Sequence, residues 1–99
     1  MALALKTEIF LESEWSELVN ELSLSPRQAE VVKHLFLAKS DKQIAGDMHI
    51  SVSTVRTYLS RLFSKFGVQD RIELMLFVLR RFRESRRKYG CHYLQRHHK

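Results

Sequence analysis

The sequence predicts an all-α fold, built as a bundle of short helices. Apolar residues make up 44% of the 99 residues, which suffices for one domain with one modest core. The three glycines, the single proline and the scarcity of turn dipeptides argue against a β-sandwich. Several stretches repeat apolar residues at helical spacing, and each follows a residue typical of a helix start.

Charge is unevenly distributed along the chain. Residues 1–23 have a net charge of −4, whereas residues 24–99 have a net charge of +10. A basic segment of this kind indicates a polyanionic partner, most simply nucleic acid. A membrane surface is the competing polyanion, but no apolar run is long enough to span a bilayer, and MALALKTEIFL is too short for a signal peptide. One cysteine, Cys91, fits the reducing cytoplasm.

The acidic segment 1–23 contains one expected helix, with Ser13 as its N-cap. Its apolar residues recur at i, i+3, i+4 and i+7, namely Trp15, Leu18, Val19 and Leu22. A buried tryptophan needs a surface to pack on, so we expect this helix to dock on the main body. Its acids then either face water or shield the basic end of the chain. The initial Met1 and this helix favour a stand-alone protein over an excised domain.

Two capping boxes predict the next two helices. Ser25, with Pro26 at the first helical position and Gln28 two residues further, starts a helix to about Leu37. Ser40 and Gln43 start a shorter helix from Asp41 to about Met48. The residues expected in the core are Ala29, Val32, Leu35 and Phe36 in the first helix, and Ile44, Ala45 and Met48 in the second.

A turn over 49–51 joins the short helix to a third one, which makes a helix-turn-helix. Ile50 is expected to fill the angle between the helices, and Ser51 to cap the helix over 52–66. Val55, Leu59, Leu62 and Phe66 form one apolar stripe of this helix. The opposite side has donors and cations but no acid, namely Ser53, Arg56, Thr57, Ser60, Arg61, Ser64 and Lys65. Such a face suits a DNA major groove, although a solvated helix covering a core would share the pattern.

Gly67 is expected to end this helix, and Asp70 with Glu73 to form a fourth capping box for a helix from Arg71. That helix has two apolar stripes: Ile72, Met75, Leu76 and Leu79 in one, and Leu74, Phe77 and Val78 in the other. Since one core needs one stripe, another subunit or the Trp15 helix should cover the second. The chain is densely basic after Arg80, which fits either a solubilising tail or added phosphate contacts.

Residues 24–80 resemble the LuxR/GerE-type helix-turn-helix family over nearly their whole length. The resemblance rests on Leu24–Arg27, Ser40–Ala45, Ile50–Ser51, Thr54–Tyr58, Gly67–Val68, Arg71 and Glu73–Leu74 in this order and spacing. It implies a four-helix DNA-binding bundle whose third helix enters the major groove and whose fourth mediates dimerisation. Here the bundle would have an extra N-terminal helix (residues 1–23) and a basic C-terminal extension (residues 81–99).

The resemblance also implies roles for individual residues. Base edges would be contacted by Arg56, Thr57 and Ser60, and phosphates by Lys42, Gln43, Thr54, Tyr58, Arg61 and Lys65. Since the resemblance gives dimerisation to the last helix, we expect one of its two apolar stripes, Ile72, Met75, Leu76 and Leu79, to form the dimer interface. The partners would be double-stranded DNA, a second copy and RNA polymerase. Family members usually have Lys at the position of Arg56 and His at the position of Tyr58, and they often have Gly near Ala38. The guanidinium of Arg56 keeps the charge and adds a two-pronged set of donors suited to guanine.

Two other functions fit parts of the pattern: a sigma-factor-like module that binds a promoter element, and a small basic adaptor that binds protein or RNA. We expect no enzyme and no catalytic residue, because none of the five histidines pairs with an acid or nucleophile at a telling spacing. Cys91, His92, His97 and His98 resemble a metal-ligand cluster. Their place near the chain end argues against one, so we expect no metal and no cofactor.

Overall fold

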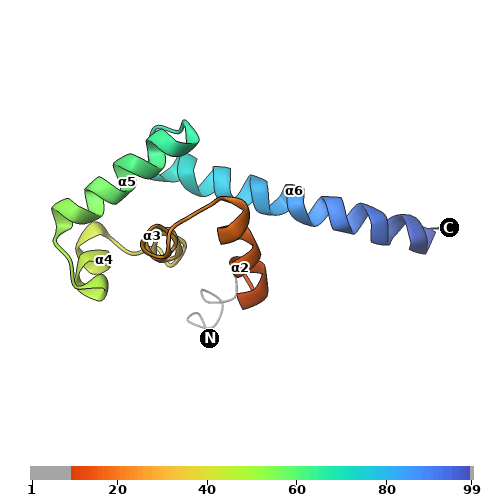
Figure 1. Cartoon of the computed structure of the whole chain (residues 1–99), viewed down its shortest axis with the longest axis horizontal. Helices are drawn as coiled ribbons and strands as arrows, with labels where there is room; N and C mark the ends of the chain where they lie inside the picture. Colours follow the sequence, from red (N-terminus) through yellow and green to blue (C-terminus); the bar gives the residue numbers. More distant parts are fainter. Residues whose placement is uncertain (1–9, 99) are drawn as a thin grey trace.

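The computed structural model of the chain describes the backbone of residues 10–98 and the side chains of residues 10–86. Within this range the chain forms five helices and no strand, which confirms the all-α prediction. The helices are α2 (Glu12–Glu21), α3 (Pro26–Phe36), α4 (Asp41–Met48), α5 (Val52–Phe66) and α6 (Arg71–His98). Figure 1 shows α3, α4 and α5 gathered at one end of the molecule, with α6 extending away from them.

The three predicted serine caps are present. The hydroxyl oxygens of Ser25, Ser40 and Ser51 accept hydrogen bonds from the backbone N–H three residues further on, at 3.1, 3.2 and 3.1 Å. In the first two, a glutamine side chain accepts a hydrogen bond from the backbone N–H of the cap residue, so both capping boxes are complete. These bonds satisfy donors that the first turn of a helix leaves free.

Two of the expected helix starts were wrong in detail. Helix α2 begins at Glu12, and its N-cap is Leu11 rather than Ser13, because the Glu14 carboxylate accepts from the Leu11 N–H at 2.9 Å. At α6, Asp70 caps the helix as expected, but the Glu73 carboxylate accepts from the Gln69 N–H instead of the Asp70 N–H. A glutamate can bond either backbone N–H, and the sequence does not decide between them.

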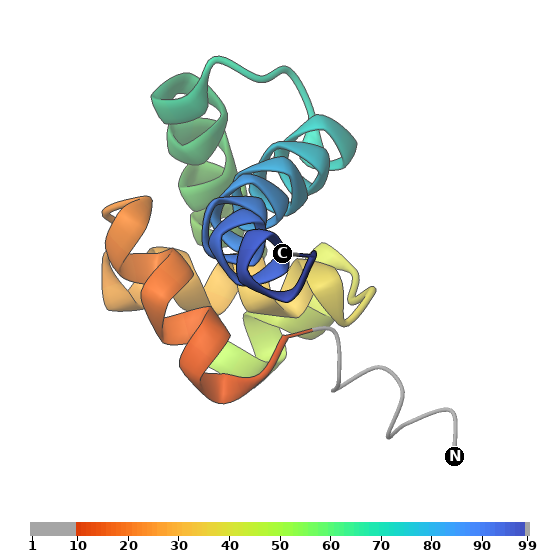
Figure 2. The same cartoon turned by 90° about the vertical axis from the view of Figure 1, so that its right-hand side faces the viewer.

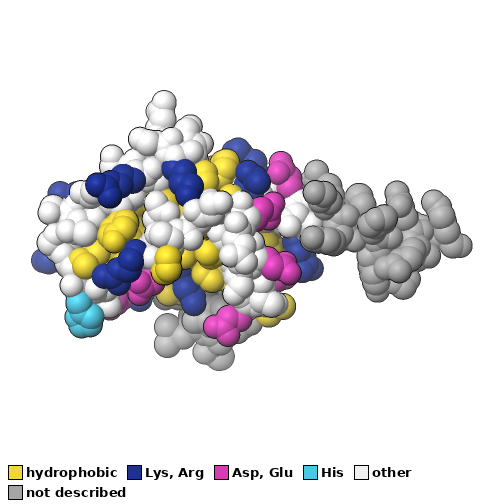
Figure 3. All heavy atoms as spheres, in the orientation of Figure 1, with side chains coloured by type: hydrophobic (Ala, Val, Ile, Leu, Met, Phe, Trp, Pro, Cys, Tyr) yellow, Lys and Arg dark blue, Asp and Glu magenta, His cyan; other side chains and the backbone are white. Residues whose placement is uncertain are grey.

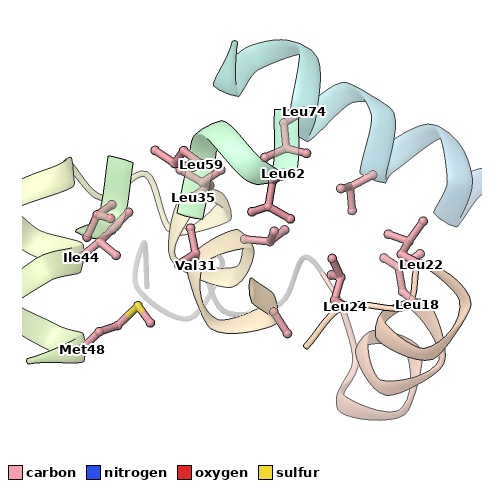
Figure 4. Packing of buried hydrophobic residues seen from close by; sticks show 14 of the residues in the cluster. Leu18, Leu22, Leu24, Val31, Leu35, Ile44, Met48, Leu59, Leu62 and Leu74 are labelled. Atoms are coloured by element: carbon pink, nitrogen blue, oxygen red, sulfur yellow. The ribbon is translucent and has the colours of Figure 1, made fainter. Parts of the chain in front are cut away.

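The predicted inward residues form one core. Ala29, Val32 and Leu35 of α3 and Ile44, Ala45 and Met48 of α4 are all buried, whereas Phe36 is half-buried at its edge. Figure 4 shows this cluster continuing from α4 through α3 and α5 to α6 and α2. Since α5 contacts α3, α4 and α6, it is the element on which these three helices pack.

Helix α2 is docked on this body, as its apolar pattern predicts. Leu18 is 2% exposed and Leu22 is 4% exposed, and both belong to the shared core. The ring of Phe10 packs against those of Trp15, Phe36 and Phe82, with centroids 4.9 to 5.5 Å apart. Viewed from the C-terminal end of α6, α2 and α5 both lie to one side of it (Figure 2).

Left-handed backbone occurs at four described positions. Gly67 ends α5 with φ 67°, as predicted. Ser23, Ala38 and His49 also have positive φ, at 56°, 61° and 58°. Side chains with a Cβ adopt this conformation at a cost. Ala38, where the resemblance leads one to expect glycine, is therefore strained, and so are Ser23 and His49.

Candidate nucleic-acid interface

Helix α5 has a buried side and an exposed side, as the sequence predicts. Val55 and Leu62 are fully buried and Leu59 is 3% exposed, which fixes the rotation of the helix about its axis. Val55 thus packs inward. The exposed side chains are those expected: Ser53, Arg56, Thr57, Ser60, Arg61, Ser64 and Lys65. The two faces are set by the helical period, so a shift of one residue would destroy both.

The exposed face of α5 has an internal order. With 3.6 residues per turn, the hydroxyl residues lie in its centre, opposite the buried stripe. Arg56 lies on one edge, toward α4, and Arg61 and Lys65 lie on the other edge. The central row consists of Ser53, Thr57, Ser60 and Ser64. A partner that approached this face would meet small polar groups first and cations on either side.

The turn before α5 holds it at an angle to α4. His49 adopts its left-handed conformation here, and the Ile50 N–H donates to the Ala45 carbonyl at 3.0 Å, which closes the end of α4. Ile50 packs against the core, as expected for a residue that fills this angle. Arg27 of α3 donates to the Met48 carbonyl at 3.4 Å and so ties the turn to the body.

Hydroxyl groups at the start of α5 are partly engaged within the helix. The Thr57 Oγ1 donates to the Ser53 carbonyl at 3.0 Å. Its proton is therefore used, while its methyl group and oxygen lone pairs stay available. The Ser51 and Thr54 hydroxyls lie 2.8 Å apart at the N-terminal end, where the helix dipole favours anions.

Arg56 has a partner that sequence reasoning missed. Its Nε lies 3.4 Å from Oδ2 of Asp41, and the other carboxylate oxygen accepts from Arg71 of α6 at 2.5 Å. The hydrogen bond from Arg71 lowers the pKa of Asp41, and Arg56 lowers it further. These three residues line an open hollow of about 510 Å³ between the starts of α4, α5 and α6. The partners are 15 and 30 residues apart in sequence, so no local pattern could reveal them.

The residues that the resemblance assigned to phosphates differ in their exposure. Lys42, Gln43 and Arg61 are exposed, and Thr54 and Tyr58 are half-buried. The Gln43 side-chain oxygen accepts from the Ser40 N–H at 2.9 Å, which leaves its amide N–H groups free. Lys65 is also exposed, but its Nζ donates to the Ser23 carbonyl at 2.5 Å. Lys65 therefore also links α5 to the turn that follows α2.

The two stripes of α6 have different surroundings. Leu74 and Val78 are fully buried, and the Phe77 ring stacks on that of Phe66 with centroids 4.6 Å apart. The other stripe faces outward: Ile72 is 61% exposed, Leu76 45% and Leu79 38%, and Met75 is half-buried. Helix α2 covers the core beneath α6 and leaves this stripe open. Of the two coverings that the sequence allowed, the Trp15 helix or another subunit, the first is therefore not used.

Among the described side chains, basic and acidic groups gather over different helices. On the face in Figure 3, Lys and Arg side chains predominate over α4 and α5, and acids gather over α2 and the middle of α6. Two α2 acids pair with α6: Glu14 with Arg86 at 2.6 Å and Glu21 with Arg81 at 3.6 Å. The acids of α2 therefore do not all face water.

Two negative findings apply to the described residues. Among the helices of residues 10–98, none has both the length and the apolarity needed to cross a membrane. Among the side chains of residues 10–86, no group of three or more His, Cys, Asp or Glu could hold a metal ion. The side chains of Cys91, His92, His97 and His98 lie outside the described residues, as do those of Arg87, Lys88, Arg96 and Lys99.

Comparison with known proteins gives a match to residues 22–78, to the family described as bacterial regulatory proteins, luxR family. Similar proteins include the probable HTH-type transcriptional regulator GfsR of Streptomyces halstedii, which is 38% identical over 55 residues. The probable transcriptional regulatory protein NarL of Mycobacterium tuberculosis is 35% identical over 57 residues, and the response regulator protein VraR of Staphylococcus aureus is 33% identical over 55. No solved structure gives a significant match.

These similarities cover just over half of this chain: 56% for GfsR, 58% for NarL and 56% for VraR. The matched regions are 23%, 26% and 26% of those proteins, so the chain spans about a quarter of the length of the curated relatives that it matches. The family match covers more than half of the chain, from the residue after α2 to Val78 in the first third of α6. The chain therefore belongs to the luxR family of bacterial regulatory proteins.

Proposed function

We propose that this protein regulates transcription by sequence-specific binding to double-stranded DNA, with α5 in the major groove. The observation that supports this most is the face of α5. Opposite its buried stripe it presents a row of hydroxyls between basic edges, and α5 contains no acid. A major groove admits one helix, and its base edges offer hydrogen-bonding groups that such side chains complement.

Base contacts are assigned to Arg56, Thr57 and Ser60. Arg56 is an arginine at the edge of the hydroxyl row, so its fork can bond guanine O6 and N7. Thr57 has already donated its proton to the Ser53 carbonyl, and its methyl group is suited to the methyl group of thymine. Ser60 lies one turn further along the same row and can donate to or accept from a base edge.

Phosphate contacts are assigned to residues around this face. Thr54 lies at the N-terminal end of α5, where the helix dipole adds to its hydroxyl. Arg61 and Lys65 lie on the edge opposite Arg56, so the two edges face the two backbones that border a groove. The remaining assigned residues are Lys42 and Gln43 of α4 and Tyr58 of α5.

A two-fold dimer through α6 completes the proposal. Between Arg71 and Arg86, the part of α6 whose side chains are described, Ile72, Leu76 and Leu79 are the large apolar side chains left exposed, with Met75 beside them. A groove of about 530 Å³ runs on from Leu76 and Leu79, but it is also lined by Arg80, Arg83 and Arg86. Residues near a two-fold axis meet their own copies, so an axis near Leu76 keeps the arginines apart. RNA polymerase is a further proposed partner, and the cytoplasm the proposed location.

The dimer determines the arrangement of the DNA site. Two α5 helices related by a two-fold axis require an inverted repeat with half-sites about one helical turn apart. Selection of bound duplexes from a random pool tests the proposal. The expected result is an enriched inverted repeat. Equal retention of all duplexes, or stronger retention of RNA, would favour the basic adaptor instead.

A further inference from the structure

Asp41 is an acid that contacts the exposed face of α5 through Arg56. It is the first residue of α4, after the Ser40 cap, and its side chain is 19% exposed. Its two carboxylate oxygens are divided between two helices: Oδ1 accepts from Arg71 of α6, and Oδ2 lies 3.4 Å from Arg56 Nε. Negative charge is favoured at the start of a helix, so the carboxylate is well placed to remain ionised.

The contact with Arg56 leaves the end of that side chain free. A guanidinium has five N–H donors, and the contact to Asp41 involves the one on Nε. The two terminal nitrogens keep four donors, which are the groups that can bond guanine O6 and N7 side by side. The Arg56 side chain is 72% exposed, so without a partner its many rotamers would all be accessible.

We propose that Asp41 is a positioning residue that orients Arg56 for base contact and thereby sets the sequence preference of the protein. The inference rests on the proposed function, in which Arg56 contacts a base. Arg71 holds the carboxylate by the shorter bond, at 2.5 Å against 3.4 Å, so the position of Asp41 is defined by the start of α6. Through Arg56 and Arg71, Asp41 connects α5, the helix proposed for base contact, to α6, the helix proposed for dimerisation.

This role has a consequence that a purely structural role lacks. A carboxylate near the DNA backbone opposes binding to every sequence, because it repels phosphates. A carboxylate that orients Arg56 favours one sequence over others. Removing its charge should therefore tighten binding to arbitrary DNA. It should also lower the ratio of the affinity for the best site to the affinity for arbitrary DNA.

Asp41→Asn tests this prediction, because asparagine keeps the shape and one carbonyl oxygen while losing the charge. The matched control is Asp47→Asn. Asp47 is an exposed acid of the same helix, bonded to Lys39 at 2.6 Å, and its removal changes the net charge equally. The probes are a duplex selected with the unmodified protein and a scrambled duplex of the same composition.

The expected result is a fall of roughly three- to tenfold in the ratio of the two affinities for Asp41→Asn, as for partial loss of one bidentate contact. Asp47→Asn should tighten both duplexes alike and leave the ratio unchanged. In the Arg56→Ala background, Asp41→Asn should no longer alter the ratio. Equal ratios for the Asp41 and Asp47 variants would overturn the inference.

A variant of Arg71 separates positioning from folding. Arg71→Gln breaks the shorter bond to Asp41 but leaves the carboxylate charge available to Arg56, so the ratio of the two affinities should fall by less than with Asp41→Asn. If it falls as far as with Asp41→Asn, Asp41 acts only through the stability of the fold and the inference is wrong. If the unmodified protein itself shows no preference among duplexes, it is the proposed function that fails.

Discussion

Replacing Leu76 by aspartate tests which stripe of α6 belongs to the core and which to a dimer. Fully burying a leucine side chain stabilises by about 1.5–3 kcal/mol. Leu76 is 45% exposed in the single chain, so a partner would bury roughly half of that value, about 1 kcal/mol. A two-fold dimer contains the contact twice, so its loss costs about 2 kcal/mol, which is roughly 30-fold in the dimer dissociation constant.

The variant should remain folded, because an exposed position tolerates a carboxylate. Its circular dichroism spectrum and melting temperature should stay close to those of the unmodified protein, while sedimentation should show a monomer that binds one half-site weakly. The matched control is Leu74→Asp: Leu74 is fully buried, so this change places an unpaired charge in the core and should unfold the protein. If Leu76→Asp unfolds instead, the faces are reversed; an unchanged sedimentation coefficient would show that this stripe mediates no dimer.

Three further perturbations test other parts of the account. Lys65→Ala should weaken binding to all duplexes and lower the salt slope by about one; an unchanged slope would leave Lys65 only its bond to the Ser23 carbonyl. His34 has a buried Nδ1 without a partner, and burial, followed by the charge of Lys39, lowers its pKa. The unfolded chain therefore binds a proton at His34 more readily than the folded chain does, and the stability of the fold should fall as the pH drops below 6.5. In His34→Gln, the melting temperature should fall less over the same pH range. An identical fall in both proteins would refute this role of His34. Changing three α2 acids to Gln should tighten DNA binding equally in the full chain and in one ending at Arg83, because buried leucines fix α2; a gain that needs the basic end would show that the acids shield it. The three acids are Glu14, Glu17 and Glu21.

Most of the fold could be predicted because its signals are local. Ser25, Ser40 and Ser51 each bond a backbone N–H three residues away, and such bonds depend on a few neighbouring residues. The burial of Val55 and the exposure of Leu76 follow from the helical period in the same way. At the start of α2 the sequence predicted the helix but not its cap, and at the start of α6 it predicted the Asp70 cap but not which backbone N–H bonds Glu73.

Side-chain partners that lie far apart in sequence could not be predicted. Lys65 bonds a carbonyl 42 residues away, and Arg86 bonds Glu14 across 72 residues. These contacts depend on how α2 and α6 pack on the body. The hydrophobic pattern predicts that they pack there, but it does not predict which side chains then meet. The same holds for Asp41: its position on α4 was predicted, whereas its contact with Arg56 depends on how α4, α5 and α6 meet.

The central claim is that α5 recognises DNA sequence through Arg56. Its most direct test is to repeat the selection from a random duplex pool with the unmodified protein and with Arg56→Ala. The account predicts an inverted repeat for the unmodified protein. For the variant it predicts the same repeat with guanine preference lost at one position in each half-site, and a loss of about 1–3 kcal/mol on the best site. An unchanged repeat with an equal loss of affinity for every duplex would show that Arg56 contacts only phosphate and would contradict the claim.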